Sequence, residues 1–267
     1  MSKAHARVRA GNRVGAPSEI WSDERGVALA AALAAELPHI PALEARLAHI
    51  ADAIAGRIAF STSLGLEDQA VLHAIAKSGR TFDVFTLDTG RHFPETLETL
   101  EASENVYGLK VRVVFPEARD VEMLVARDGI MGFRQSVEAR KACCDVRKVR
   151  PLNKALAGAS GWLTGLRRDQ SAERAQVPFA AWDAEHRLVK LNPLADWSLE
   201  MLEAYIAEHA IPVNPLHARG FPSIGCQPCT RAIRPGEDIR AGRWWWENQD
   251  GKECGLHNRP KPKEAHA

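Results

Sequence analysis

The segment RIAFSTSLGLEDQAVLHAIAKSG (residues 57–79) decides the fold that the sequence predicts. It opens with RIAFSTS, a short apolar, β-prone run that ends in small hydroxyl residues and is typical of a buried strand. A helical pattern follows and ends at Gly79, a residue type that commonly closes helices. A strand joined to a helix is the repeating half of a βαβ unit, so this segment predicts an α/β fold.

The same alternation continues downstream. TFDVFTLDTG (residues 81–90) has the pattern of a second buried strand, and FPETLETLEASENVYG (residues 93–108) that of a helix with Pro94 in its first turn. LKVRVVF (residues 109–115) follows as a third strand. Because βαβ crossovers place helices on the faces of a sheet, this spacing predicts a twisted, mostly parallel sheet with flanking helices.

Further elements are predicted on both sides of these strands. They are helices at residues 22–37 and 42–55, mostly helical structure from Pro116 to about residue 157, short strands within residues 161–171 and 187–198, and a helix capped by Ser198. Proline and glycine recur beyond residue 211, where regular structure is doubtful. We divide the chain into a basic tail with a helical extension (1–56), an α/β domain (57–235) and a C-terminal tail (236–267).

The composition is that of an ordinary globular protein and argues against several classes of function. The chain has 267 residues, of which 45% are hydrophobic and 26% charged, with a formal net charge of +1. So balanced a charge gives no general reason to expect a nucleic-acid partner. No apolar run is long enough to span a membrane, and the first residues lack the apolar core of a signal peptide. We therefore expect no membrane association and a cytoplasmic location.

Five cysteines in a chain expected to stay reduced indicate metal or redox chemistry more than a disulfide framework. Cys143 and Cys144 are adjacent, and Cys226 and Cys229 form a C-x-x-C pair. Together they offer four thiolates, a full ligand set for one tetrahedral ion or for an iron–sulfur cluster. Adjacent cysteines do not easily converge on one ion, so the pattern favours a cluster over zinc. Reactive or inert thiols are the third interpretation.

The adjacent cysteines lie in RKACCDVRKVRPL, which is rich in cations. These are Arg140, Lys141, Arg147, Lys148 and Arg150, against the single acid Asp145. The run is either a solvated helix face or a cationic wall beside an anionic cluster and an anionic substrate. Lys148, one helical turn after Cys144, is the best placed for the second role.

Two loops have the composition of an anion-binding site. FSTSLGLED (residues 60–68) leads from a strand through hydroxyl residues and Gly65 into a helix, and LDTGRHFPET (residues 87–96) ends the next strand with Asp88 and Arg91. Neither is a P-loop or a dinucleotide fingerprint, and an ordinary strand–helix turn is the alternative. Because the loops follow neighbouring strands, they predict a nucleotide crevice at the carboxyl end of the sheet.

Other arginines add to this expected anion site. Arg167 and Arg168 in GLRRDQS are either a bidentate clamp for phosphate or sulfate, or an exposed salt-bridge pair. Arg240 and Arg243 precede three consecutive tryptophans, which we expect to anchor the tail on the core.

Cys254, in GKECGLHN (residues 251–258), is left without a partner once the other four cysteines are assigned. The polar sequence around it offers little apolar cover, so a buried inert thiol is disfavoured. It is either a bystander on the surface or a nucleophile. His257 could lower its pKa or orient it, whereas Glu253 would act against a low pKa.

Six motifs in order now resemble a known family. They are STSLGLED, LDTGRHFPET, KACCDVRKVRPL, GLRRDQS, GCQPCTRAIRPGEDIRAGRWWWE and KECGLH. The chain resembles the phosphoadenylyl-sulfate (PAPS) reductase family, and within it the assimilatory adenylyl-sulfate (APS) reductases, from about residue 57 to residue 258. The resemblance implies a fold like that of the adenine-nucleotide alpha-hydrolases.

The resemblance also implies roles for individual residues. It implies a [4Fe-4S] cluster on Cys143, Cys144, Cys226 and Cys229, and a catalytic cysteine at Cys254. Ser61 and Ser63 match the family's modified phosphate loop. The positions that match the anion pocket are Lys148, Arg167 or Arg168, Arg240, Arg243 and His257.

The activity that the resemblance implies is reduction of APS to sulfite and AMP through an S-sulfocysteine, with thioredoxin or a glutaredoxin-like protein as reductant. Both cysteine pairs are present, whereas the cluster-free branch that uses PAPS lacks them, which favours APS. A PAPS-preferring or dual-specificity reductase is one alternative, and a non-catalytic, metal-bearing nucleotide-binding protein is another. The family further implies a homotetramer or homodimer.

Overall fold

The computed structural model describes residues 22–171 and 174–247. Cys254 and His257, named above as catalytic and anion-binding candidates, lie outside these residues. The described chain is built on a six-stranded sheet with the strand order β3-β2-β1-β4-β6-β5. The strands are β1 (Ile58–Thr62), β2 (Asp83–Leu87), β3 (Arg112–Val114), β4 (Gly161–Leu163), β5 (Ala180–Asp183) and β6 (Leu188–Leu191).

The sheet is parallel except at one edge, which confirms the mostly parallel sheet expected from the sequence. β1 pairs in parallel with β2 and β4, and these pair in parallel with β3 and β6. β5 runs antiparallel to β6 and is not among the strands that the sequence predicts. Its sequence, AAWD, lacks the β-branched residues that mark strands elsewhere in the chain.

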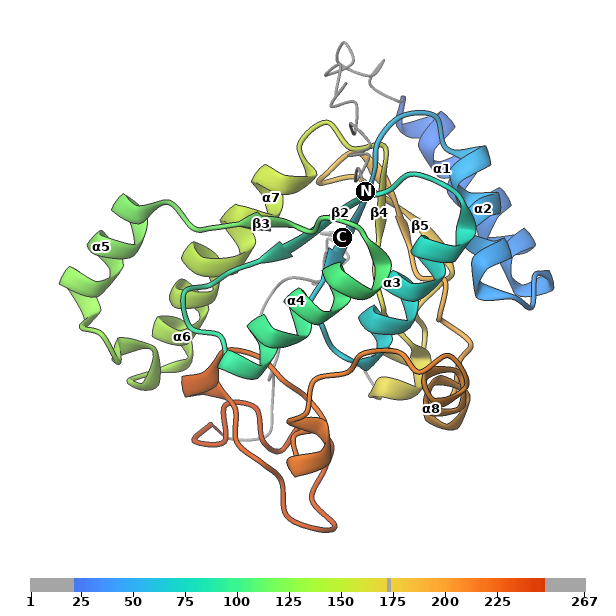
Figure 1. Cartoon of the computed structure of the whole chain (residues 1–267). Helices are drawn as coiled ribbons and strands as arrows, with labels where there is room; N and C mark the ends of the chain where they lie inside the picture. The colour runs from blue at the N-terminus through green and yellow to red at the C-terminus, as the bar shows by residue number, and fades with distance from the viewer. Residues whose placement is uncertain (1–21, 172–173, 248–267) are drawn as a thin grey trace, which may run out of the picture.

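Helices cover both faces of this sheet (Figure 1). They are α1 (Asp23–Glu36), α2 (Leu43–Ala53), α3 (Leu66–Ser78), α4 (Pro94–Tyr107), α5 (Ala118–Asp128), α6 (Val137–Cys144), α7 (Arg150–Leu156) and α8 (Leu199–Glu208). Alternate residues of β1 point to opposite faces. Ile58 and Phe60 pack in a core with α1, α2, α3 and α8, while Ala59 packs with Leu152 of α7.

Local capping explains where several helices begin and end. The hydroxyls of Ser22 and Ser198 accept hydrogen bonds from the first turns of α1 and α8. Ser198 is the cap that the sequence predicts. Gly79 and Gly108 close α3 and α4 in left-handed conformations that favour glycine. These caps fix where α1 and α8 begin and where α3 and α4 end.

The segment after α8 is irregular, as predicted, and carries two short 3-10 helices, His217–Arg219 and Gln227–Cys229. Figure 1 shows it in orange to red, folded back beside the α/β core.

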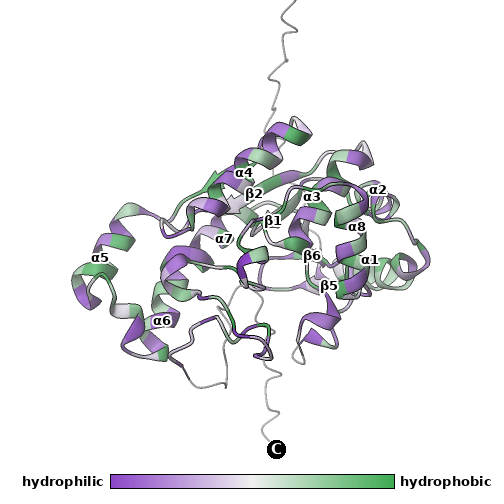
Figure 2. Ribbon diagram, turned by 60° about the horizontal axis from the view of Figure 1, so that its bottom comes forward, coloured by the Kyte–Doolittle hydropathy of each residue, from purple (hydrophilic) through white to green (hydrophobic). Residues whose placement is uncertain are grey.

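At the far edge, α5 alternates hydrophobic and hydrophilic stretches (Figure 2). None of the helices in the described residues combines the length and the apolar character needed to cross a membrane.

Candidate active site

A cavity of about 250 Å³ lies at the carboxyl ends of β1, β2 and β4. Its wall is built from the loops that follow these strands, together with residues 222–225 and 239–244 of the irregular segment. Ligands of α/β sheets bind in this position because the loops and helix N-termini there face a common crevice. The nucleotide crevice predicted from the two loops therefore coincides with a real cavity.

The loop after β1 forms one side of the cavity. Ser61 and Ser63 both line it, and the Ser61 hydroxyl accepts a hydrogen bond of 2.8 Å from the Trp162 indole. Leu64 has φ +61°, a left-handed conformation, and Gly65 then caps α3. The N-terminus of α3 thus opens toward the cavity, where its free N–H groups and helix dipole favour an anion.

Asp68 in the first turn of α3 is buried at the edge of this loop. Its carboxylate accepts hydrogen bonds of 2.6 Å from both the N–H and the hydroxyl of Ser63. Burial raises the pKa of Asp68 to about 6, although the hydrogen bonds from Ser63 oppose the shift. A Cβ on Gly165 would lie 2.4 Å from the Asp68 Oδ1, so only glycine lets the β4 loop approach this closely.

Asp68→Asn tests this environment. A carboxyl that keeps its proton to pH about 6 when folded, but loses it near 3.8 when unfolded, makes the wild type less stable as pH rises across that interval. Asparagine does not titrate. We expect the unfolding free energy of Asp68→Asn, relative to wild type, to rise by about 2–3 kcal/mol between about pH 4 and about pH 7.

Unfolding curves across this pH range measure the difference. Asp52→Asn is the matched control, because the hydrogen bond and charge of Arg80 lower the pKa of this exposed carboxyl and give its pH dependence the opposite sign. Parallel curves for wild type and Asp68→Asn would show that the Asp68 pKa is not raised.

Cationic side chains from three segments line the same cavity. They are Lys148, Arg167, Arg174, Arg240 and Arg243. Arg174 was not singled out from the sequence. In the structure it donates a hydrogen bond to Gln170, four residues earlier. Arg243 is held near Ser223 and Ile224, and a Cβ on Gly225 would lie 2.3 Å from its Nη2. Glycine at 225 is thus required for this position of Arg243.

The two adjacent arginines of GLRRDQS point in different directions. Arg167 is 2% exposed and donates to the Glu67 carboxylate at 2.9 and 3.0 Å beside the cavity. Arg168 instead donates to the Val177 carbonyl at 2.9 Å and lies over the Phe179 ring, away from the residues that line the cavity. The geometry therefore favours Arg167 as the anion-facing member.

The loop after β2 leads to a second, smaller pocket. Asp88 accepts a hydrogen bond from the Gly90 N–H, and neither Asp88 nor Arg91 lines the larger cavity. Arg91 lies over the Phe133 ring and lines the smaller pocket instead. The Thr89 hydroxyl lies 3.3 Å from the sulfur of Cys226.

The smaller pocket is lined by four thiols, those of Cys143, Cys144, Cys226 and Cys229. The first two are the last residues of α6. Cys226 precedes the Gln227–Cys229 turn, and Cys229 ends it. A π-helical turn, Asp145–Val149, follows Cys144 directly; such turns are rare and are frequent at functional sites. The turn carries Arg147 and Lys148, which both line the pocket.

The pocket is electropositive. Burial alone would raise the pKa of Cys226, but Lys148, the Thr89 hydroxyl and two arginines outweigh it and lower that pKa. At Cys143 and Cys229 burial prevails over the nearby cations and raises the pKa. Buried N–H groups at Nη1 of Arg91 and Nε of Arg147 have no hydrogen-bond partner within the described residues. Four thiols with cations and unsatisfied donors around them suit a group that is held by thiolates and is negative overall.

Lys148 belongs to both cavities. It lines the larger cavity beside the anion loop and the smaller pocket beside the thiols. Arg243 and Trp244 are likewise shared. The anion site and the thiol pocket therefore share one wall, which explains why one short motif carries both cysteines and cations.

Known proteins resemble this chain over most of its length. Residues 57–232 match the family model of the phosphoadenosine phosphosulfate reductase domain. The adenosine 5'-phosphosulfate reductase of Agrobacterium fabrum is 55% identical over 215 residues, covering 80% of this chain and 82% of that protein. The reductase of the same name from Allochromatium vinosum is 52% identical over 212 residues, covering 78% and 83%.

A solved structure shows the same fold. The phosphoadenylyl-sulfate reductase of Candida auris, in a phosphate complex, superposes with a TM-score of 0.66 at 24% identity, covering 80% of this chain and 98% of that one. The family suggested by the six motifs is confirmed. With most of its length matched both to the family model and to relatives more than half identical, the chain belongs to the phosphoadenosine phosphosulfate reductase family.

Proposed function

We propose that the protein reduces APS to sulfite and AMP as an oxidoreductase of sulfate assimilation. The observation that carries this proposal is the wall shared by the anion cavity and the thiol pocket, with Lys148 in both. Such a site suits an anionic substrate whose chemistry takes place at sulfur. The names of relatives 52–55% identical to the chain support APS as that substrate.

Each group of the cavity then has a role in binding. The phosphosulfate lies at the loop of Ser61, Ser63 and Gly65, facing the N-terminus of α3. Lys148, Arg240 and Arg243 neutralise the negative charge that builds on the phosphate and sulfonate oxygens in the transition state. In this assignment Arg167 contributes to the cationic wall. Asp88 holds the turn after β2, Arg91 faces the thiol pocket, and Arg168 holds the chain near Val177.

The four thiols fit an iron–sulfur cluster, and we propose that Cys143, Cys144, Cys226 and Cys229 hold a [4Fe-4S] cluster. The unsatisfied donors of Arg91 and Arg147 and the cations around the pocket support this fit. When bound, the cluster supplies a fixed negative charge and a cross-link between the α6 end and the Gln227–Cys229 turn. It does not need to change its redox state.

The chemistry is a sulfonyl transfer followed by thiol–disulfide exchange. The thiolate of Cys254 attacks the sulfur of the phosphosulfate, an S–S bond forms, the S–O bond breaks and AMP leaves. A dithiol reductant then attacks the Cys254 sulfur, releasing sulfite and forming a mixed disulfide. Its second thiol resolves that disulfide, so the dithiol is oxidised to a disulfide and its two electrons reduce the sulfate-level sulfur of APS to sulfite. His257 would orient Cys254 or lower its pKa.

The reductant fits a thioredoxin or a glutaredoxin-like protein, because the second step needs two neighbouring thiols. We propose a cytoplasmic location and a homo-oligomeric state, tetramer or dimer, on the same family basis. The division into residues 1–56, 57–235 and 236–267 stays a prediction from the sequence.

Substrate preference tests the proposal. We expect kcat/KM with thioredoxin to be at least about tenfold higher for APS than for PAPS. Steady-state sulfite release with each nucleotide measures the ratio. A ratio below one would make the protein a PAPS reductase, and release from neither nucleotide by brown, cluster-containing protein would support the non-catalytic alternative.

A further inference from the structure

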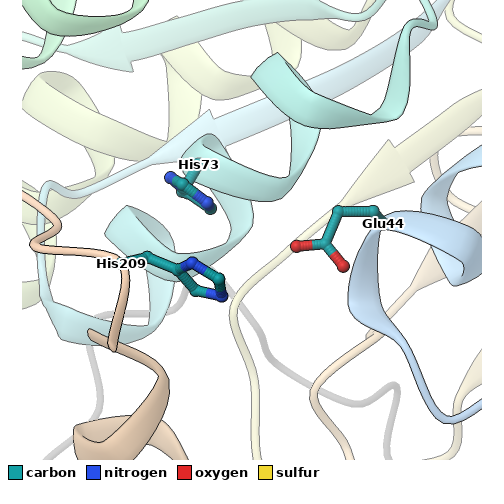
Figure 3. Close-up of side chains that lie close together, drawn as sticks. All are labelled: Glu44, His73 and His209. Atoms are coloured by element: carbon teal, nitrogen blue, oxygen red, sulfur yellow. The ribbon is translucent and has the colours of Figure 1, made fainter. Parts of the chain in front are cut away.

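A group of three side chains that could hold a metal ion lies outside both cavities. Glu44 of α2, His73 of α3 and His209, which ends α8, come together with their ligand atoms all within 4.8 Å of one another. Figure 3 shows the carboxylate and the two rings around a common space. None of the three lines the anion cavity or the thiol pocket.

His73 is the fixed member of this group. It is 5% exposed, and within the described residues its ring makes no hydrogen bond, although it stacks on the His209 ring at 4.8 Å. Burial, together with the charges of His209 and Lys77, lowers the pKa of His73. The ring is thus held neutral, and neutral imidazole is the form that binds metals. Because the ring makes no hydrogen bond within the described residues, its nitrogens are available to a ligand.

The other two members can adjust. Glu44 is half-buried and His209 is exposed at the end of its helix. Around a tetrahedral zinc ion with bonds of about 2.0–2.1 Å, neighbouring ligand atoms lie about 3.3 Å apart, so closure requires movements of only about 1–1.5 Å. The Tyr205 hydroxyl already donates a hydrogen bond to Glu44, as the outer partners of metal ligands do.

We propose that Glu44, His73 and His209 bind a divalent first-row transition metal of the zinc type. Two imidazoles and one carboxylate suit zinc and its neighbours rather than calcium or magnesium, which prefer oxygen ligands alone. The ion joins α2, α3 and α8. α3 begins at the anion loop, and in the proposed function its N-terminus faces the phosphosulfate. The ion would therefore link α2 to the helix that borders the substrate site.

Zinc titration of the full-length, cluster-loaded protein tests this site. The titration is run in the Cys254→Ser background, because an accessible thiol would itself bind zinc. We expect one zinc ion per chain by calorimetry and equilibrium dialysis, with iron content unchanged and a higher thermal unfolding midpoint. His209→Ala and Glu44→Gln should each weaken binding at least tenfold, and Tyr205→Phe by no more than about tenfold.

His49→Ala is the matched control. His49 also faces a carboxylate, that of Glu36 at 2.7 Å, but it belongs to no three-ligand group in the described chain. We expect this variant to bind zinc as the parent does. Binding that His209→Ala and Glu44→Gln leave within twofold of the parent, or the lack of any saturable site, would overturn the proposal.

Discussion

Cys254→Ser is expected to lower thioredoxin-dependent sulfite release by at least about 10³-fold, because serine cannot replace a thiolate nucleophile and cannot form the S-sulfo intermediate. The residues that line the anion cavity are untouched by the change. APS should therefore bind to the variant with an affinity within a few fold of that of wild type. Sulfite assays and equilibrium binding of APS measure the two effects separately.

The iron content of Cys254→Ser is its internal control. If the four other cysteines hold the cluster, the variant keeps the wild-type iron content and visible absorption. A variant that still turned over at a rate near that of wild type would exclude Cys254 as the nucleophile. Loss of iron together with activity would instead make Cys254 a cluster ligand.

Lys148→Met is expected to lower kcat/KM for APS by about 10²–10³-fold. Lys148 is a cation in the wall between the anion cavity and the thiol pocket, so its charge acts on both. Methionine keeps the length of the side chain and removes the charge. Because charge builds during the reaction, kcat should fall more than the affinity for AMP.

Lys154→Met provides the comparison. Lys154 lies only six residues further along, in α7, and pairs with Glu117 at 2.5 Å on the surface, away from both cavities. We expect its kcat/KM to stay within twofold of wild type. Equal losses in the two variants would show that charge in this helical region acts nonspecifically, and not through the shared wall.

Periodicity and capping made most of the fold predictable. The strand–helix alternation starting at residue 57 predicts the parallel strands, and the hydroxyl of Ser198 marks the start of α8 correctly. β5 escaped because an edge strand is held by its pairing with β6 more than by its own sequence. The π-helical turn after Cys144 left no sequence signal that could be distinguished from an α-helix.

The site was predictable as a set of motifs but not as directions of side chains. Ser61, Ser63, Arg240 and Arg243 gather at one cavity. Which of Arg167 and Arg168 faces it depends on the contact of Arg167 with Glu67, which is distant in the chain, and on the packing of Arg168 over Phe179.

The proposed metal site of Glu44, His73 and His209 could not be predicted from the sequence at all. Glu44, His73 and His209 lie on helices far apart in the chain. Each of them, taken alone, looks like an ordinary surface or core residue. Only the packing of α2, α3 and α8 brings the three together.

Mass analysis after a single turnover tests the central claim most directly. The cluster-loaded protein is incubated with APS without reductant and digested. The mass of the peptide that contains Cys254 is then measured by mass spectrometry. We expect one added sulfonate group on Cys254, an equivalent of AMP released, and loss of the adduct with release of sulfite when thioredoxin is added. AMP and sulfite formed with thioredoxin while Cys254 stays unmodified in its absence would contradict that claim.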